Sequence, residues 1–95
     1  MTKKIVIIDD DPIIVRYLTN IFESNGYATH SAAGGAAGME EVRREKPDLI
    51  TLDLQMPDQW GPRFYQQLRK DKTLVKIPII VITGLSGGKH SIPKA

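Results

Sequence analysis

Short apolar runs alternate with segments of helical periodicity in this chain, and this alternation constrains its fold more than any other feature. The clearest apolar runs are 5–8, 48–54 and 77–83. Continuous apolar runs of this length are typical of strands that are covered on both faces. Because chains that alternate strand and helix form a parallel sheet with right-handed crossovers, we predict an α/β domain with helices on both faces of the sheet.

The ends of the predicted elements carry recognisable signals. Asp11 is a suitable N-cap and Pro12 a suitable first residue for the first helix, and Gly26 ends it. Gly38 lies inside the second helix, where glycine costs about 1 kcal/mol relative to alanine. In chain order we predict a strand at 5–8, a helix at 12–25, a strand at 27–32, a helix at 36–46, a strand at 48–54, a loop at 55–61, a helix from Pro62 and a strand at 77–83.

Length and composition limit the classes of protein to which the chain can belong. Its 95 residues suffice for one domain, and 41% apolar with 25% charged residues are ordinary values for a soluble globular protein. With no cysteine, a net charge of +2 and scattered basic residues, we expect neither a thiolate metal site nor direct nucleic-acid binding. The apolar run after Lys4 is too short for a signal peptide or a membrane span, so we expect a cytoplasmic protein.

Polar side chains stand at the ends of three predicted strands. Asp9, Asp10 and Asp11 follow the first strand, Asp53 lies near the end of the third, and Thr83 ends the fourth. In parallel sheets of this type the ligand lies beyond the carboxyl ends of the strands, so these side chains are expected to converge. Adjacent carboxylates repel one another and resist burial, which favours a bound cation.

This set of side chains suits a phosphoryl-transfer site. Mg²⁺ prefers one or two carboxylates together with carbonyls and waters, and Asp10 with Asp53 would provide such a pair. Asp9 would hold a metal-bound water. A carboxylate whose charge is offset by a metal can act as a nucleophile toward phosphorus and form an aspartyl phosphate. The hydroxyl of Thr83 would then donate a hydrogen bond to a phosphoryl oxygen.

At these positions the chain resembles the receiver domain of two-component response regulators. The resemblance rests on IVIIDDDP at 5–12, on PDLITLDLQMPD at 47–58 with Gly61, on PIIVITG at 78–84, and on the spacing between these motifs. It implies a flavodoxin-like, doubly wound parallel sheet with the strand order 2-1-3-4 and with the family's fifth strand missing.

The resemblance also implies a role for each site residue. Asp53 would be the phosphoacceptor, Asp10 a direct Mg²⁺ ligand, and Asp9 a ligand through water. The backbone carbonyl of Gln55 would be a further ligand, and Thr83 would be the hydroxyl that moves toward the phosphoryl group. The phosphodonor would be a sensor histidine kinase or a histidine phosphotransfer protein.

The first helix is a candidate docking surface for that donor. Its apolar arc, from Ile13 round to Val15, spans about 200°, which is wider than the stripe of about 100° that faces a core. We therefore expect Ile13 or Val15 at the exposed margin. In the family this helix is part of the surface that docks the phosphodonor, which makes both residues candidates for that contact.

The last residues depart from the family pattern. Receiver domains continue with a fifth strand that ends in a lysine and with a fifth helix, whereas 84–95 contains no apolar run. We therefore expect a single, C-terminally truncated receiver domain, with 1–83 as its core and 84–95 as a flexible tail. The fourth strand is apolar on both faces although it would lie at a sheet edge, and this pattern predicts self-association.

Two other functions remain open from the sequence. Haloacid dehalogenase phosphohydrolases also use aspartate and Mg²⁺, and 9–11 and 79–84 resemble two of their motifs. That hypothesis leaves Asp53 without a role, and the chain has no room for the later motifs of those enzymes. The other alternative is a degenerate binding module that never takes up a phosphoryl group.

Overall fold

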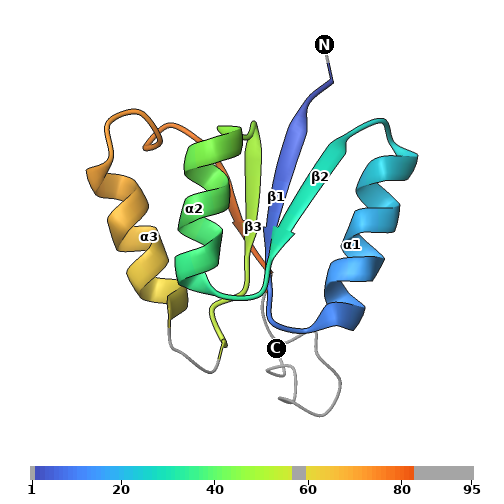
Figure 1. The fold of residues 1–95 in the computed structure, drawn as a ribbon, viewed down its shortest axis with the longest axis horizontal. Helices are drawn as coiled ribbons and strands as arrows, with labels where there is room; N and C mark the ends of the chain where they lie inside the picture. Colours follow the sequence, from blue (N-terminus) through green and yellow to red (C-terminus); the bar gives the residue numbers. More distant parts are fainter. Residues whose placement is uncertain (1, 57–59, 83–95) are drawn as a thin grey trace, which may run out of the picture.

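The computed structural model describes residues 2–56 and 60–82 of the chain. Strand and helix alternate throughout these ranges, as the sequence predicts (Figure 1). The elements are β1 (Lys4–Ile8), α1 (Pro12–Ser24), β2 (Ala28–Ala32), α2 (Gly35–Glu45), β3 (Leu49–Leu52), α3 (Trp60–Lys70) and β4 (Ile79–Val81).

The described strands form one parallel sheet in the order β2-β1-β3-β4, which confirms the predicted doubly wound fold and its strand order. Ile7 pairs with Thr51, and Thr51 pairs in turn with Ile80. This register brings the carboxyl ends of β1, β3 and β4 to the same edge of the sheet. That edge is at the bottom of Figure 1, where the chain passes from β1 into α1.

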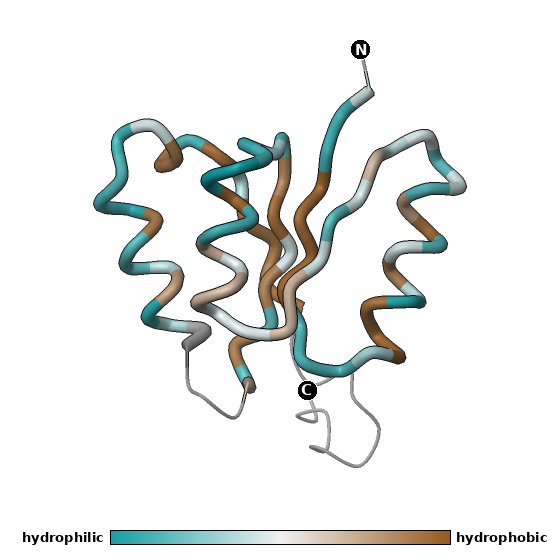
Figure 2. Tube along the Cα trace, in the orientation of Figure 1, coloured by the Kyte–Doolittle hydropathy of each residue, from teal (hydrophilic) through white to brown (hydrophobic). Residues whose placement is uncertain are grey.

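Helices cover both faces of the sheet, and the alternation along β1 shows why. Ile5 and Ile7 pack with Ile14 and Leu18 of α1 on one face. Successive side chains of a strand point to opposite faces, so the other β1 side chains contribute to a second cluster beneath α2 and α3. Figure 2 shows the result, with hydrophobic segments along the central strands and mixed segments along the helices. The second cluster contains Val6, Ile8, Met39, Val42, Ile50, Leu52, Met56, Phe64, Leu68 and Leu74.

The glycine inside α2 has a packing role. A Cβ atom on Gly38 would lie 2.8 Å from Cδ1, 3.1 Å from Cγ1 and 3.2 Å from Cγ2 of Ile8, a fully buried side chain of β1. Glycine at this position therefore lets α2 lie close to the sheet, which explains why the helix forms despite the unfavourable propensity of the residue.

Several predicted boundaries differ from the structure. The third helix begins at Trp60, two residues before the predicted Pro62. Proline is tolerated there because the first N–H groups of a helix have no intrahelical partner. The third strand ends at Leu52 and the fourth is confined to Ile79–Val81, so both are shorter than predicted. Thr83 and the predicted tail at 84–95 lie outside the described residues.

Within 2–56 and 60–82, no helix has both the length and the apolar character needed to cross a membrane.

Candidate metal and phosphoacceptor site

Three aspartates meet at the carboxyl edge of the sheet. Asp9 and Asp10 follow β1, and Asp53 follows β3. The N–H of Asp53 donates to the carbonyl of Ile8 at 3.0 Å, so the pairing of the two strands continues up to the site. One carboxylate oxygen from each aspartate lies within 4.8 Å of the others. Of the side chains predicted to converge, the structure therefore brings together those of Asp9, Asp10 and Asp53.

The carboxylates of Asp9 and Asp53 are anchored by the same local hydrogen bond. Oδ1 of Asp9 accepts the N–H of Asp11 at 2.9 Å, and Oδ1 of Asp53 accepts the N–H of Gln55 at 2.9 Å. A bond from an aspartate to the amide two residues later is typical of an Asx turn. The N–H of Asp9 also donates to the carbonyl of Ala32 at 3.1 Å, which ties the end of β1 to β2. Both carboxylates thus have fixed orientations.

Burial makes it unfavourable for the three aspartates to carry their negative charges close together. Asp9 is 5% exposed and Asp53 is 3% exposed, whereas Asp10 is half-buried. Negative charges buried this close together repel one another unless positive charge offsets the repulsion. The donor set is made entirely of carboxylate oxygens, which are the ligands that Mg²⁺ and other hard cations prefer. The three residues therefore fit a hard divalent cation.

Asp11, the third of the consecutive aspartates 9–11, caps the N-terminus of α1. Its Oδ1 accepts the N–H of Ile13 at 2.9 Å, and Pro12 is the first residue of α1. This geometry confirms the predicted N-cap. Asp11 does not belong to the group of carboxylates that includes Asp53.

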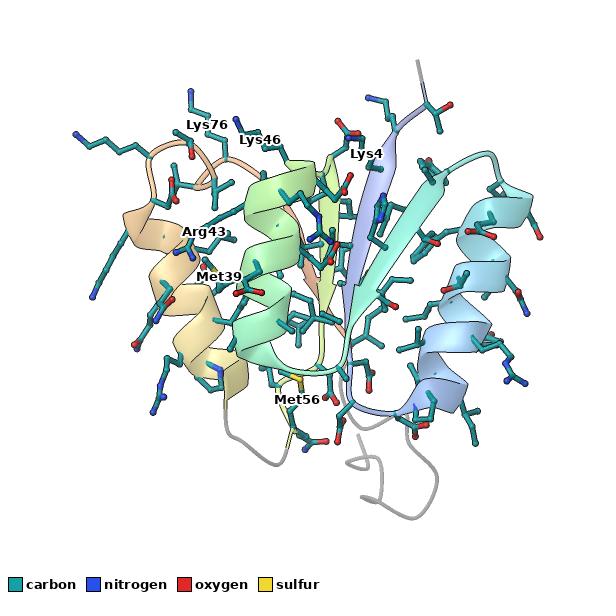
Figure 3. All side chains as sticks on the ribbon, viewed as in Figure 1. Lys4, Met39, Arg43, Lys46, Met56 and Lys76 are labelled. Atoms are coloured by element: carbon teal, nitrogen blue, oxygen red, sulfur yellow. The ribbon has the colours of Figure 1, made fainter. Side chains whose placement is uncertain are left out.

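The segment after Asp53 is fixed by a residue that the sequence analysis did not single out. Met56 is 3% exposed and packs in the cluster beneath α2 and α3, at the lower end of the molecule in Figure 3. The turn through Gln55 is thus held between a hydrogen bond and a buried side chain. The sequence shows Met56 only as one of the apolar residues of the predicted loop at 55–61.

A hollow lies beside the aspartates, with a cavity volume of about 510 Å³. Val15 is half-buried and borders this hollow, and it also packs against the cluster beneath α1. The hollow is therefore bounded on one side by the carboxylates and on the other by α1. The lining residues are Asp9, Asp10, Pro12, Val15, Ser31, Ala32 and Ala33.

The outer surface of α1 carries exposed apolar side chains. Ile13 is 75% exposed, so of the two predicted docking residues it is the one at the exposed margin. Tyr17 and Ile21 are 59% and 40% exposed and follow at intervals of four residues, which places them on the same side of the helix. The apolar pattern of the sequence does not show that these two side chains are exposed.

The predicted hydroxyl residue is not described. The N–H of Ile82 donates to the carbonyl of Leu52 at 2.9 Å, so β4 reaches the same edge as the aspartates. Thr83 is the next residue and lies outside the described ranges, so its role stays a prediction.

Comparison with known proteins identifies the family. Residues 5–92 match the model of the response regulator receiver domain. Protein Rrf1 of Nitratidesulfovibrio vulgaris is 33% identical over 95 residues, which are 100% of this chain and 69% of that protein. The chain belongs to the response regulator receiver domain family.

Solved structures agree with this assignment. The N-terminal domain of a response regulator receiver protein from Methanoculleus marisnigri JR1 superposes with a TM-score of 0.80 at 27% identity, over 85% of this chain and 66% of that one. The phosphorylated cyanobacterial phytochrome response regulator RcpA gives a TM-score of 0.79 at 26% identity, over 87% of this chain and 66% of that one. The chain thus spans about two thirds of the length of these relatives.

Proposed function

We propose that this receiver domain accepts a phosphoryl group on Asp53 in a reaction that depends on Mg²⁺, and that it acts as a signalling switch. The observation that carries the proposal is the group formed by Asp9, Asp10 and Asp53, whose carboxylate oxygens lie within 4.8 Å of one another. The similarity to the phosphorylated RcpA structure supports it, since that relative is described as phosphorylated.

Each residue of the group has a proposed role. Asp10 is assigned as a direct Mg²⁺ ligand together with Asp53 and the backbone carbonyl of Gln55, and Asp9 as a ligand through water. When bound, the cation offsets the negative charge that gathers as phosphorus is attacked. The hydroxyl of Thr83 is assigned to a phosphoryl oxygen.

The chemical step transfers a phosphoryl group from an imidazole nitrogen of the donor histidine to a carboxylate oxygen of Asp53. Oδ1 of Asp53 accepts the Gln55 N–H, so we assign the attack on phosphorus to Oδ2. The bond between Oδ2 and phosphorus forms as the bond between phosphorus and the imidazole nitrogen of the donor breaks. The electron pair of that bond stays on the imidazole. The other ring nitrogen of the donor imidazole carries a proton during the transfer, so the products are an aspartyl phosphate and a neutral histidine.

The proposed donor is a sensor histidine kinase or a histidine phosphotransfer protein. We assign its docking surface to the exposed side of α1, centred on Ile13, which is the most exposed of the large apolar side chains described. Tyr17 and Ile21 extend this surface along the helix. Val15 would contact the donor at the rim of the hollow beside Asp10.

The test measures where phosphate is attached. The chain is incubated with Mg²⁺ and a small acyl phosphate, and its intact mass is compared with those of Asp53→Asn and Asp48→Asn variants. Asp48 is exposed and lies just before β3, at the far end from the site, so it is the matched control. We expect one added phosphoryl group in the wild type and in Asp48→Asn, and none in Asp53→Asn or after chelation of Mg²⁺.

Peptide mapping of the adduct separates the alternative functions. A phosphoryl group on the peptide that contains Asp9 would indicate the nucleophile of a haloacid dehalogenase and would overturn the proposal. Mg²⁺ binding without any adduct from acyl phosphate or phosphohistidine donors would instead identify a binding module.

A further inference from the structure

A histidine and two glutamates form a second group of possible metal ligands, separate from the aspartates. A ring nitrogen of His30 and one carboxylate oxygen each from Glu41 and Glu45 lie within 4.8 Å of one another. All three side chains are half-buried. Imidazole nitrogen and carboxylate oxygen are ligands that Zn²⁺ commonly takes in proteins. The group therefore has the chemical character of a transition-metal site.

The local structure explains why these three side chains meet. His30 pairs with Val6 of β1, and Val6 packs in the cluster beneath α2 and α3. Paired residues of neighbouring strands point to the same face of a sheet, so His30 faces α2. Glu41 and Glu45 are four residues apart, which places them side by side on one face of that helix. Since α2 packs against β2, the two carboxylates reach the imidazole.

The separation between His30 and Glu45 suits a shared ion. Nε2 of His30 lies 3.3 Å from Oε1 of Glu45. A hydrogen bond between N–H and O is usually about 2.9–3.0 Å long. Two ligands that are each about 2.1 Å from a tetrahedral Zn²⁺ ion are about 3.4 Å apart. The observed distance is thus long for a hydrogen bond and fits two ligands of one ion.

Glu41 has a buried oxygen that no described residue satisfies. Its Oε2 contacts Nη2 of Arg44, whereas its Oε1 is buried and has no hydrogen-bond partner among the described residues. A buried carboxylate oxygen without a partner is unfavourable, and a bound ion or water is a usual explanation for one. This oxygen is independent evidence that the group accepts a ligand.

Arg44 leaves one oxygen of each glutamate available. Nη2 of Arg44 contacts Oε2 of Glu41, and its Nε lies 3.5 Å from Oε2 of Glu45. In Glu45 the other oxygen, Oε1, faces His30. Residues that contact the far side of metal ligands in this way hold the ligands in their binding orientation.

Lys4 competes with a cation for the same oxygen. It lies at the start of β1 (Figure 3), and its Nζ is 3.4 Å from Oε1 of Glu45 and 3.2 Å from the carbonyl oxygen of that residue. An ammonium group this close repels a metal ion. The side chain of Lys4 is 44% exposed, so its charged end can turn into water when a metal ion binds.

We propose that His30, Glu41 and Glu45 bind a divalent transition-metal ion, with Zn²⁺ as the ion that best matches the ligand types. The ligands are Nε2 of His30 and Oε1 of both glutamates, and a water molecule completes the coordination. The bound ion links β2 to α2. The proposal does not rest on the phosphoacceptor role of Asp53, because it uses none of the aspartates.

The first test is a calorimetric titration of the full chain with ZnCl₂ in excess Mg²⁺, which competes for the aspartates. We expect one Zn²⁺ per chain. His30→Gln and Glu41→Gln should each raise the dissociation constant at least about tenfold. His90→Gln removes the only other histidine of the chain and should change it little. Circular dichroism checks that all variants fold.

Three outcomes of this titration would overturn the proposal. The first is no detectable binding of Zn²⁺, which would leave the three residues as an ion-pair network only. The second is binding that His30→Gln does not weaken. The third is binding that is lost in Asp10→Asn but kept in His30→Gln, which would place the ion at the aspartates.

A lysine substitution separates a metal site from an ion-pair network. Lys4→Gln removes the competing ammonium group, so Zn²⁺ should bind about two- to fivefold more tightly than to the wild type. Weaker or unchanged binding in Lys4→Gln would contradict the assignment of Oε1 of Glu45 as a ligand.

Nuclear magnetic resonance of the imidazole rings identifies the ligand atom. On addition of ZnCl₂ the Nε2 resonance of His30 should shift strongly, and the ring of His90 should not respond. A response at Nδ1 of His30, or at His90 alone, would refute the proposed coordination.

Discussion

The close contact between α2 and β1 at Gly38 yields a quantitative prediction. In Gly38→Ala the new methyl group would meet three side-chain carbons of Ile8, the nearest at 2.8 Å. Ile8 is 1% exposed and is branched at Cβ, so it has little freedom to move aside. It also immediately precedes Asp9, so any displacement of Ile8 is passed on to the acidic site.

Two effects of opposite sign set the magnitude. Alanine favours the helix over glycine by about 1 kcal/mol. Forcing a methyl group into a well-packed core costs about 1–3 kcal/mol. We therefore expect Gly38→Ala to lower the free energy of unfolding by about 1 kcal/mol. In an Ile8→Val background the nearest carbon, Cδ1, is absent, and the same substitution should be close to neutral.

The assay is a double-mutant cycle followed by urea unfolding and far-UV circular dichroism. The coupling free energy between Gly38→Ala and Ile8→Val should be about 1 kcal/mol, as expected for residues in contact. Ala37→Gly, at an exposed position of the same helix, measures the propensity effect alone. If Gly38→Ala stabilises the protein by as much as Ala37→Gly destabilises it, with no coupling to Ile8, the packing argument is wrong.

Three further predictions concern stability. Thr51 Oγ1 is buried without a hydrogen-bond partner among the described residues, so Thr51→Val should raise the free energy of unfolding by about 1 kcal/mol in urea titrations. Removing the N-cap with Asp11→Ala should lower the melting temperature by about 4–8 °C, whereas Asp11→Asn, which keeps a capping oxygen, should change it little. Burial alone would raise the pKa of Glu45, but Lys4, His30 and Arg44 together hold it below its usual value. The folded state thus favours the ionised form, so this stabilisation is complete above about pH 4.5 and is lost as the pH falls through the folded pKa. In Glu45→Gln the unfolding midpoint should therefore fall less between about pH 6 and about pH 3 than it does in the wild type.

The order of elements and the position of the site were predictable from local patterns. The continuous apolar run of β1, followed directly by aspartates, specifies both a buried strand and the polar residues at its end. The same holds for β3 and Asp53. Because parallel strands share one carboxyl edge, the meeting of Asp9, Asp10 and Asp53 follows from topology alone.

Other features depend on contacts between distant segments and were not predictable. Helical periodicity identified the apolar residues of α1, but it does not indicate how much of the helix the sheet covers, and Tyr17 and Ile21 proved to be exposed. The reason for Gly38 appears only when Ile8 is placed against it. Nothing in the sequence places His30 near Glu45, yet Nε2 of His30 lies 3.3 Å from Oε1 of Glu45, across the interface between β2 and α2.

The paired hydrogen bonds at Asp9 and Asp53 have a thermodynamic consequence for ligand affinity. Ordering a flexible side chain on binding costs about 0.5–1.5 kcal/mol in rotamer entropy. Both carboxylates are ordered already by the amides of Asp11 and Gln55. Together these bonds make cation binding more favourable by about 1–3 kcal/mol, because the two side chains need not be ordered on binding. This corresponds to a dissociation constant that is lower by a factor of between about five and a hundred. Two backbone amides that need never touch the ligand thus help to determine how tightly it binds.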